Sequence, residues 1–181
     1  EWVHFQDADD LLLPRFAQAA RDAVSDLIDA WIPRWRHIEA SSGALLGESL
    51  LDAALLARDP VAASLLSTIN NVGAYRSSVV RACGGFGNVP AFLHNEDRAF
   101  HLALAQRGAR FALGDEMLVE TRRNAGSMST ANQAACLRAH GAVTRAYAER
   151  NPGRHRDECA AALWQAATGL ASLRHFEEAD A

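Results

Sequence analysis

The sequence predicts an α/β domain, in which a mixed sheet is flanked by helices, followed by a C-terminal helical tail. Two observations along the 181 residues support this fold class. Short apolar runs typical of strands alternate with longer stretches of helical periodicity as far as residue 122. From Thr130 onward the patterns are helical, with an interruption at 151–154. We therefore expect a first domain over residues 1–129 and a helical extension over residues 130–181.

The chain opens with a predicted strand, a helix and a second strand. Residues 2–6 are apolar and aromatic and read as a strand, and Pro14 suits the first turn of a helix. Apolar residues at helical spacing extend that helix over residues 15–31. Pro33 is expected to end it, because proline lacks the amide hydrogen that a helix interior needs. The run at 34–41 then predicts the second strand.

The middle of the chain predicts helix before a third strand. Residues 43–66 are rich in Ala and Leu and favour a helix, which Pro60 should break. Residues 71–77 have the pattern of a strand. The glycines and the proline of residues 83–90 then predict a loop, which separates this strand from the next helix.

One further helix and two further strands complete the predicted domain. The helix spans residues 95–106, and Gly108 should cap its C-terminus. Residues 109–113 and 116–122 read as two strands. The Gly-Asp pair between them is a turn signal, so we expect the two strands to be separate.

Composition excludes several classes of function. The chain has 18 basic and 22 acidic residues, a net charge of −4, and every basic residue is Arg. Without lysine, neither Schiff-base chemistry nor a P-loop lysine is available within this chain. The charge balance predicts no basic surface of the kind that binds nucleic acid, so we expect no nucleic-acid partner.

Compartment signals point to a cytoplasmic protein. No apolar run reaches the length of a membrane span, and the first residues lack a basic-then-apolar signal pattern. The three cysteines, Cys83, Cys136 and Cys159, are far apart, which argues against a disulfide framework and for a reducing compartment. We expect a cytoplasmic location, with a peripheral position at the inner face of the membrane as a further option.

Three acids follow the first predicted strand, in the stretch "QDADD". Asp7 and Asp9 stand two residues apart, so in an extended strand their carboxylates would point to the same side. The carboxyl ends of strands border the ligand crevice of open α/β sheets. Two or three carboxylates there, with Asp10 as the third, suit a hard cation such as Mg²⁺ or Mn²⁺.

Two other interpretations of these acids remain open. Aspartate is a favoured turn and helix-capping residue, and a helix follows. Alternatively, Asp7 is the nucleophile of a phosphotransfer or phosphatase domain. In such domains a Thr or Val usually follows the second Asp, and Leu11 holds that place here, which argues against this alternative.

A second acidic pair opens the helix predicted at 95–106. Asn95 is a suitable N-cap, and Glu96 and Asp97 fall in the first turn, where acids complement the helix dipole without any further function. Alternatively, one of these carboxylates faces a cleft as a general base. The helix N-terminus should then depress its pKa, so that it is ionised and only mildly basic near neutral pH.

Four segments taken together are more specific than either acidic pair alone. They are, in chain order, "QDADD", "NNVGAYRSSVVRACGGF", "NEDRAFHLALAQRGARFAL" and "EMLVETRRNAGSMS". In this order and spacing, over about residues 2–130, the chain resembles the inverting GT-A glycosyltransferases of family 2. The resemblance implies a partial GT-A, Rossmann-like mixed sheet, with residues 1–129 as a glycosyltransferase-like catalytic domain.

The resemblance also implies roles for the acids. Asp7 and Asp9, with Asp10 as an alternate, would hold a divalent metal, Mg²⁺ or Mn²⁺, and the ribose–diphosphate of a nucleotide sugar. Asp97 would deprotonate the acceptor hydroxyl, which attacks the anomeric carbon with inversion. Glu96 would help to position the acceptor.

Further residues are implied in donor or acceptor binding. Gly84 and Gly85 would let the backbone approach the sugar, although a plain turn explains them equally well. Arg122 or Arg123 would meet the diphosphate by a bidentate contact, or else be a solvated charge at a strand end. Arg76 reads as a surface residue at a strand end.

Two departures from the family pattern limit what the resemblance implies. Asn124 stands where many members have His, and Asn is a poorer metal ligand, so metal retention is in doubt. The family's first βα units, which carry the base-binding Asp, have no counterpart before the first acids. We therefore expect a truncated chain that binds nucleotide sugar weakly by itself, with a missing N-terminal half or a homo-oligomer as its partner.

The expected function is metal-assisted transfer of a sugar from a nucleotide-diphosphate sugar to a hydroxyl of a glycan or lipid-linked acceptor. The alternative is a non-catalytic, truncated or degenerate glycosyltransferase-like module that acts in assembly through its helical tail. The seven histidines show no paired metal spacing and are expected to be structural or at the surface. The four tryptophans are expected in the core or at an interface, with stacking on a sugar as an option.

Overall fold

The computed structural model describes residues 1–87, 89–124, 126 and 131–173. The expected domain boundary at 129/130 lies outside these residues. So do the serines of the segment "RRNAGSMS" and the tail "HFEEADA". The predictions made for them are therefore not addressed by the structure.

The strands form one mixed sheet. In chain order they are β1 (Trp2–His4), β2 (Leu11–Leu12), β3 (Ala30–Glu39), β4 (Leu45–Glu48), β5 (Ala74–Arg76) and β6 (Phe111–Arg123). The order across the sheet is β1-β5-β3-β6-β2, and β4 also pairs with β3. Strands β3 and β6 are parallel, and the other pairs in the described part of the chain are antiparallel. The predicted mixed sheet is confirmed.

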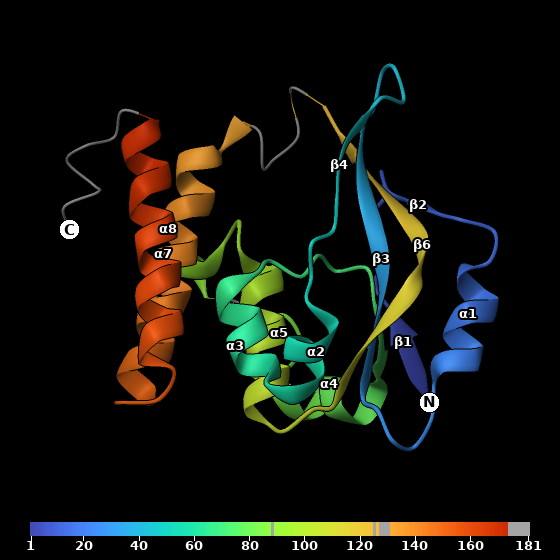
Figure 1. Ribbon diagram of the computed structural model, residues 1–181, viewed down its shortest axis with the longest axis horizontal. Coiled ribbons are helices and arrows are strands. Elements are labelled where there is room, and N and C mark those ends of the chain that lie inside the picture. The colour runs from blue at the N-terminus through green and yellow to red at the C-terminus, as the bar shows by residue number, and fades with distance from the viewer. Residues whose placement is uncertain (88, 125, 127–130, 174–181) are drawn as a thin grey trace.

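Helices lie on both sides of this sheet. They are α1 (Phe16–Ala23), α2 (Ala53–Arg58), α3 (Pro60–Leu66), α4 (Ser77–Cys83), α5 (Glu96–Gln106), α7 (Gln133–Arg150) and α8 (Arg156–Ser172), with a short 3-10 helix, η1 (Pro90–Phe92). Figure 1 shows α1 on one side of the sheet, α2 to α5 on the other, and the pair α7 and α8 outermost. Within the described residues, no helix combines the length and the hydropathy needed to cross a bilayer.

The first predicted helix is wrong in its second half. Helix α1 ends at Ala23, and the apolar residues that follow enter β3, where Ala30, Trp31 and Ile32 are buried. A strand buried on both faces is a continuous apolar run, so periodicity alone cannot separate it from a helix. Pro33 lies inside β3 and does not end a helix.

The predicted turn at Gly114 is also wrong, because β6 is one strand with an irregularity. Ile32 pairs with Leu113 and Arg34 pairs with Met117, so three residues of β6 stand opposite Pro33 alone. Since Pro33 has no amide hydrogen to donate to the ladder, a bulge at this point costs the sheet little. Gly114 belongs there because a Cβ atom would lie 3.0 Å from the indole nitrogen of Trp31.

The predicted helix over 43–66 begins later than expected. Its first residues form β4, which pairs antiparallel with β3, and Asp52 then caps α2 by accepting a hydrogen bond from the Leu55 amide at 2.9 Å. The predicted break at Pro60 is confirmed, since Asp59 caps α3 just after α2 ends. At β4, cross-strand pairing outweighs helix propensity. This pairing depends on the neighbouring strand β3 and cannot be read from the segment itself.

Three further features agree with the sequence, whereas β2, α4 and η1 were not among the predicted elements. Strand β5 lies within the predicted segment, α5 begins at Glu96, and Gly108 follows its end with a φ of 79°. The two C-terminal helices are separated near Gly153, as expected. All three cysteines are free thiols, in agreement with the predicted absence of disulfides.

The C-terminal helices are packed onto α3 and α5. A second hydrophobic cluster joins the four helices, and its members are Leu65, Leu102, Val143, Tyr147 and Cys159. His155 adds a polar link, because its ring nitrogens contact the Tyr147 hydroxyl at 2.6 Å and the Asp59 carboxylate at 3.1 Å. Helices α7 and α8 therefore stand beside the elements that border the site described below.

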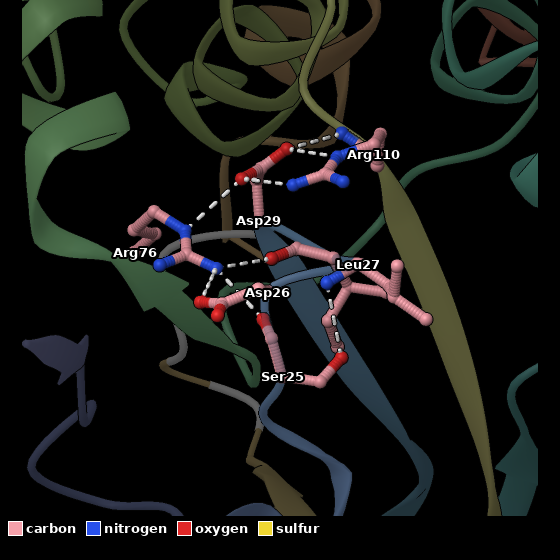
Figure 2. Close-up of polar contacts among 7 residues, drawn as sticks. Ser25, Asp26, Leu27, Asp29, Arg76 and Arg110 are labelled. Atoms are coloured by element: carbon pink, nitrogen blue, oxygen red, sulfur yellow. Dashed lines mark hydrogen bonds and ion pairs between the residues drawn. The ribbon is translucent and has the colours of Figure 1, made fainter.

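The start of β3 is held by a cluster of charges. Figure 2 shows the Asp29 carboxylate between two guanidinium groups, with Arg110 Nε at 2.9 Å and Arg76 Nε at 3.0 Å. Arg76 also donates to the carbonyls of Ser25 and Ile28. The hydrogen bonds from Arg110, and to a lesser degree that from Arg76, lower the pKa of Asp29 to about 2. Arg76 therefore ties β5 to β3 as a structural residue, whereas a surface residue at a strand end was predicted.

Candidate active site

A cleft of about 850 Å³ opens beside the carboxyl-terminal halves of β3 and β6. Both acidic groups singled out in the sequence line it. The residues that line it include Asp7, Asp9, Asp10, Trp35, His37, Glu48, Thr68, Asn70, His94, Glu96, Asp97, Thr121, Arg122 and Arg123, with Cys136 from α7 and Gln165 from α8. The expected convergence of Asp7–Asp10 with Asp97 is therefore present in the fold.

The first acids converge through a turn and not through strand alternation. Strand β1 ends at His4, and the Asp10 amide donates to the Asp7 carbonyl at 3.2 Å, which closes the turn. The Gln6 side chain donates to the carbonyls of Asp7 and Asp10, each at 3.0 Å. The argument that Asp7 and Asp9 share one side of an extended strand is wrong, although both still line the cleft.

Asp10 fixes this turn against the sheet. Its Oδ1 atom accepts a hydrogen bond from the Arg122 amide at 3.0 Å. Burial raises the pKa of Asp10 to about 6, against the opposing effect of that hydrogen bond. Burial also raises the pKa of Asp7, and the charges of Asp9 and Glu96 raise it further. The turn therefore holds carboxylates that repel one another at neutral pH.

Asp97 lies in the first turn of α5 and is the most perturbed acid of the cleft. Burial first, and then the charges of Glu96 and Asp7, raise its pKa to about 7, although the Asn71 amide opposes the shift. The prediction that the helix N-terminus would depress this pKa is wrong. Desolvation and neighbouring negative charges outweigh a helix dipole, and neither the burial nor the charge of Asp7 can be read from the helix alone.

A buried pair of side chains orients the residue that carries this carboxylate. His101 accepts the hydroxyl hydrogen of Tyr75 at 2.8 Å, and its other ring nitrogen donates to the Asp97 carbonyl at 2.7 Å. Burial lowers the pKa of His101 to about 4, so the ring is neutral at pH 7 and has one donor and one acceptor. This chain of hydrogen bonds couples the first turn of α5 to β5.

Arg98 anchors the same turn from the other side. The residue is 2% exposed, and its guanidinium donates to the Ser64 carbonyl at 2.9 Å and also contacts the Leu65 carbonyl. Its Nε atom donates to Asn95 at 3.1 Å. These carbonyls lie at the C-terminal end of α3, where a helix has unpaired acceptors and favours a cation. The start of α5 is therefore held firmly to α3.

The other residues predicted for the site divide into two groups. Glu96, Arg122 and Arg123 line the cleft. Gly84 and Gly85 are not among the lining residues. They lie at the C-terminal end of α4, with φ values of 84° and 65°. Left-handed backbone is the usual reason for glycine at a helix end, so their place supports the plain-turn interpretation.

The cleft offers carboxylate oxygens of the kind that bind a hard cation. Among the described residues, no group of three or more His, Cys, Asp or Glu side chains is placed to hold a metal ion. Asp10 already accepts a hydrogen bond from the Arg122 amide, and Asp7 and Asp9 remain as candidate ligands. Their mutual repulsion is of the kind that Mg²⁺ or Mn²⁺ relieves, with further ligands from water or phosphate. The residue types fit such a cation, and metal binding stays a prediction.

Sequence reasoning did not single out several residues that line this cleft, among them Trp35 and His94. Trp35 lies in the middle of β3 and is 3% exposed, and His94 comes just before α5 with a φ of 74°. The histidine was expected to be structural or at the surface. The only sequence signal for His94 was its place two residues before Glu96. Trp35 gave no such signal, because it reaches the cleft through the sheet register.

Comparison with known proteins identifies the fold. Residues 1–349 of TarS from S. aureus, crystallised in complex with UDP-GlcNAc, superpose on this chain with a TM-score of 0.62 and 14% sequence identity. The match covers 95% of this chain and 49% of that one, so the chain spans about half the length of the TarS structure. TarS is a GT-A-like glycosyltransferase. The chain has a glycosyltransferase fold. No protein-family model and no curated protein sequence matches it.

Proposed function

We propose that this chain carries the catalytic base and part of the donor site of a glycosyltransferase. The reaction transfers a sugar from a nucleoside diphosphate sugar to an acceptor hydroxyl, with inversion at the anomeric carbon. One observation carries the proposal: Asp97 and the Asp7–Asp10 turn line a single cleft in a chain with a glycosyltransferase fold.

Asp97 is the proposed general base. It takes the proton of the acceptor hydroxyl while the hydroxyl oxygen forms a bond to the anomeric carbon and the bond to the diphosphate breaks. A single displacement of this kind inverts the anomeric centre. A pKa of about 7 suits this role, because general bases work best when their pKa lies near the operating pH. Glu96 beside it would position the acceptor.

The donor diphosphate is proposed to lie against the Asp7–Asp10 turn. Asp7 and Asp9 would hold a divalent cation, which when bound would neutralise charge on the departing diphosphate. Arg122 and Arg123 line the same cleft and are proposed to contact the phosphate oxygens. The amide of Arg122 already holds Asp10, so the basic strand end and the acidic turn form one unit.

Titration with UDP-GlcNAc tests the donor side. Trp35 lines the cleft, so its fluorescence should report an occupied donor site. We expect saturable quenching when UDP-GlcNAc is added at constant Mn²⁺, and a loss of that quenching in Asp9→Asn. Asp115→Asn is the matched control, because it removes an exposed acid of β6 outside the cleft. Absence of a saturable change, or an unchanged response in Asp9→Asn, would contradict the proposal.

A further inference from the structure

His4, the last residue of β1, has hydrogen-bond partners on both nitrogens of its ring. The Nδ1 atom lies 2.8 Å from the carbonyl oxygen of Gly73, and the Nε2 atom lies 3.0 Å from Oε1 of Gln6. A neutral imidazole has one N–H group, so it can donate one of these hydrogen bonds and must accept the other. The partners of His4 therefore decide how many hydrogens its ring carries.

The partner at Nδ1 can only accept, because a main-chain carbonyl has no hydrogen to donate. The position of this carbonyl is fixed by tight packing around Gly73. A Cβ atom there would lie 2.7 Å from the Trp31 carbonyl and 2.6 Å from Cδ1 of Ile32. His4 pairs with Ala74 in the ladder between β1 and β5, which keeps the ring beside the same carbonyl. The Nδ1 atom therefore carries a hydrogen.

The partner at Nε2 is also an acceptor, because the orientation of the Gln6 amide is fixed. The nitrogen of this amide donates to the carbonyls of Asp7 and Asp10, each at 3.0 Å. If the amide were turned round, its oxygen would face two carbonyl oxygens, and both hydrogen bonds would become repulsions. The Gln6 oxygen therefore faces His4, and the Nε2 atom needs a hydrogen to bond to it. Both ring nitrogens donate, so the ring is an imidazolium cation.

The surroundings of the ring suit a positive charge. Burial raises the pKa of Asp7, and the charges of Asp9 and Glu96 raise it further. The charge of His4 acts in the opposite direction, so a cation at this place offsets part of the repulsion among the acids. The Phe16 ring of α1 packs against the imidazole with ring centroids 4.7 Å apart, and an aromatic ring is a favourable neighbour for a cation.

The Gln6 amide links this cation to the acidic turn. It bonds the carbonyls of the first and last residues of the turn, which the hydrogen bond from the Asp10 amide to the Asp7 carbonyl closes. The Gln6 side chain is exposed, so without an anchor it would gain rotamer freedom by leaving the turn for water. A hydrogen bond to a charged donor is stronger than one to a neutral donor. The charge on His4 therefore fixes Gln6, and Gln6 fixes the turn.

We propose that His4 is doubly protonated in the folded chain and is a positioning residue, which holds the Asp7–Asp10 turn in place through Gln6. His4 is not among the residues that line the cleft, so it acts through the turn. The inference rests on the proposed function for the role of the turn in donor binding. The protonation of the ring follows from its hydrogen bonds and does not depend on that role.

A ¹⁵N NMR spectrum of the histidine rings tests the protonation of His4 in the whole chain. At about pH 7.5 a histidine in ordinary surroundings is mostly neutral, and one of its nitrogens has no hydrogen. For His4 we expect a hydrogen on both nitrogens, and His4→Asn would assign the signals. Gln6→Leu should convert the ring to the neutral form, with the hydrogen on Nδ1.

Gln18→Leu is the matched control, because the exposed Gln18 side chain bonds Asp22 and Arg21 within α1. It should leave the His4 signals unchanged. A ring nitrogen without hydrogen in the parent chain would overturn the inference. Two protonated nitrogens in Gln6→Leu would do the same, because the charge would then not depend on the link to the turn.

Hydrogen exchange and UDP-GlcNAc binding test the positioning role. Gln6→Leu should speed exchange of the Asp10 amide about tenfold, as expected when the turn loses a hydrogen bond. It should also weaken UDP-GlcNAc binding at constant Mn²⁺ by about tenfold. Gln6→Glu keeps an acceptor for His4 and has no hydrogen to donate to the turn, so it should retain the doubly protonated ring and still speed exchange. Unchanged exchange in both variants would refute the positioning role.

Failure of the proposed function would give a different result. The parent chain would then show no saturable response to UDP-GlcNAc, while the His4 ring and the exchange of the Asp10 amide behaved as expected. A normal response to UDP-GlcNAc that Gln6→Leu leaves unchanged would remove the positioning role and leave the donor site standing.

Discussion

Two aspartates of this fold have opposite surroundings. Asp29, at the start of β3, is held by Arg110 and Arg76, and its pKa falls to about 2. Asp97, in the cleft beside the far half of β3, is buried and has other acids nearby, and its pKa rises to about 7. The residue type is the same, and the difference lies in burial and in whether the charge is compensated.

The comparison separates charges that stabilise the fold from charges that cost it stability. A carboxylate between two guanidinium groups joins three segments of the chain, and its charge is compensated without a ligand. A group of uncompensated carboxylates is unfavourable in the free protein and becomes favourable when a cation or a proton arrives. Strongly perturbed acids in a cleft are therefore candidates for function, on physical grounds.

The largest expected effect is on catalysis. Asp97→Asn removes the proposed base and keeps the shape of the side chain, so sugar transfer should fall on the order of 10²–10⁴-fold. The measurement is release of UDP from UDP-GlcNAc that depends on an added acceptor. Equal activity of the variant and the parent chain would exclude Asp97 as the base.

A smaller effect is expected at the opposite end of β3. Asp29→Asn leaves Arg76 and Arg110 without their carboxylate, and the free energy of unfolding should fall by about 2 kcal/mol, in line with the lowered pKa. Urea denaturation would measure the change. Asp26→Asn is the control, because the Asp26 side chain is fully exposed and its ion pair with Arg76 is long, at 3.8 Å. Similar losses in both variants would refute a special role for Asp29.

The smallest expected effect is the opposite pH dependence of the two regions. The raised pKa of Asp97 stabilises the folded state below its ordinary value of 3.8, and this stabilisation is lost as the pH rises towards about 7. The lowered pKa of Asp29 stabilises the folded state above 3.8, and this contribution is lost as the pH falls towards about 2.

Denaturation at several pH values checks this contrast. Relative to the parent chain, Asp97→Asn should gain stability progressively between about pH 4 and pH 7, because the parent chain loses the contribution of the raised pKa over that range. Asp29→Asn should show its deficit above about pH 4 and lose it in stronger acid. If the stability of Asp97→Asn and that of the parent chain changed in the same way with pH, the Asp97 carboxyl of the parent chain would titrate near its ordinary pKa.

Local signals predicted the parts of the fold that depend on near neighbours in the chain. The Pro60 break, the start of α5 at Glu96 and its end before Gly108 follow from capping and backbone chemistry within a few residues. Strand β4 and the bulge in β6 opposite Pro33 depend on which strand lies alongside. That information is absent from a single segment, so propensity and turn signals failed there.

The site shows the same division between local and distant causes. The acids at Asp7, Asp9 and Asp97 were found from their types and positions, and the cleft does bring them together. The pKa of Asp97 was misjudged because its largest cause, burial, exists only in the folded chain, and because the charge of Asp7 comes from a distant part of the chain and adds to that of the adjacent Glu96. His94 was missed because its backbone strain and unpaired nitrogen exist only in the folded chain.

Titration of the Asp97 carboxyl by ¹³C NMR, with and without Mg²⁺, tests most directly whether the two acidic clusters form one cation-assisted site. Asp97→Asn would assign the signal. We predict a pKa of about 7 in the absence of the cation. Saturating Mg²⁺ should lower it, because a cation at Asp7 and Asp9 offsets charge that raises it, and Asp9→Asn should abolish that response. An Asp97 that titrates near its ordinary value, or that ignores Mg²⁺, would contradict the account.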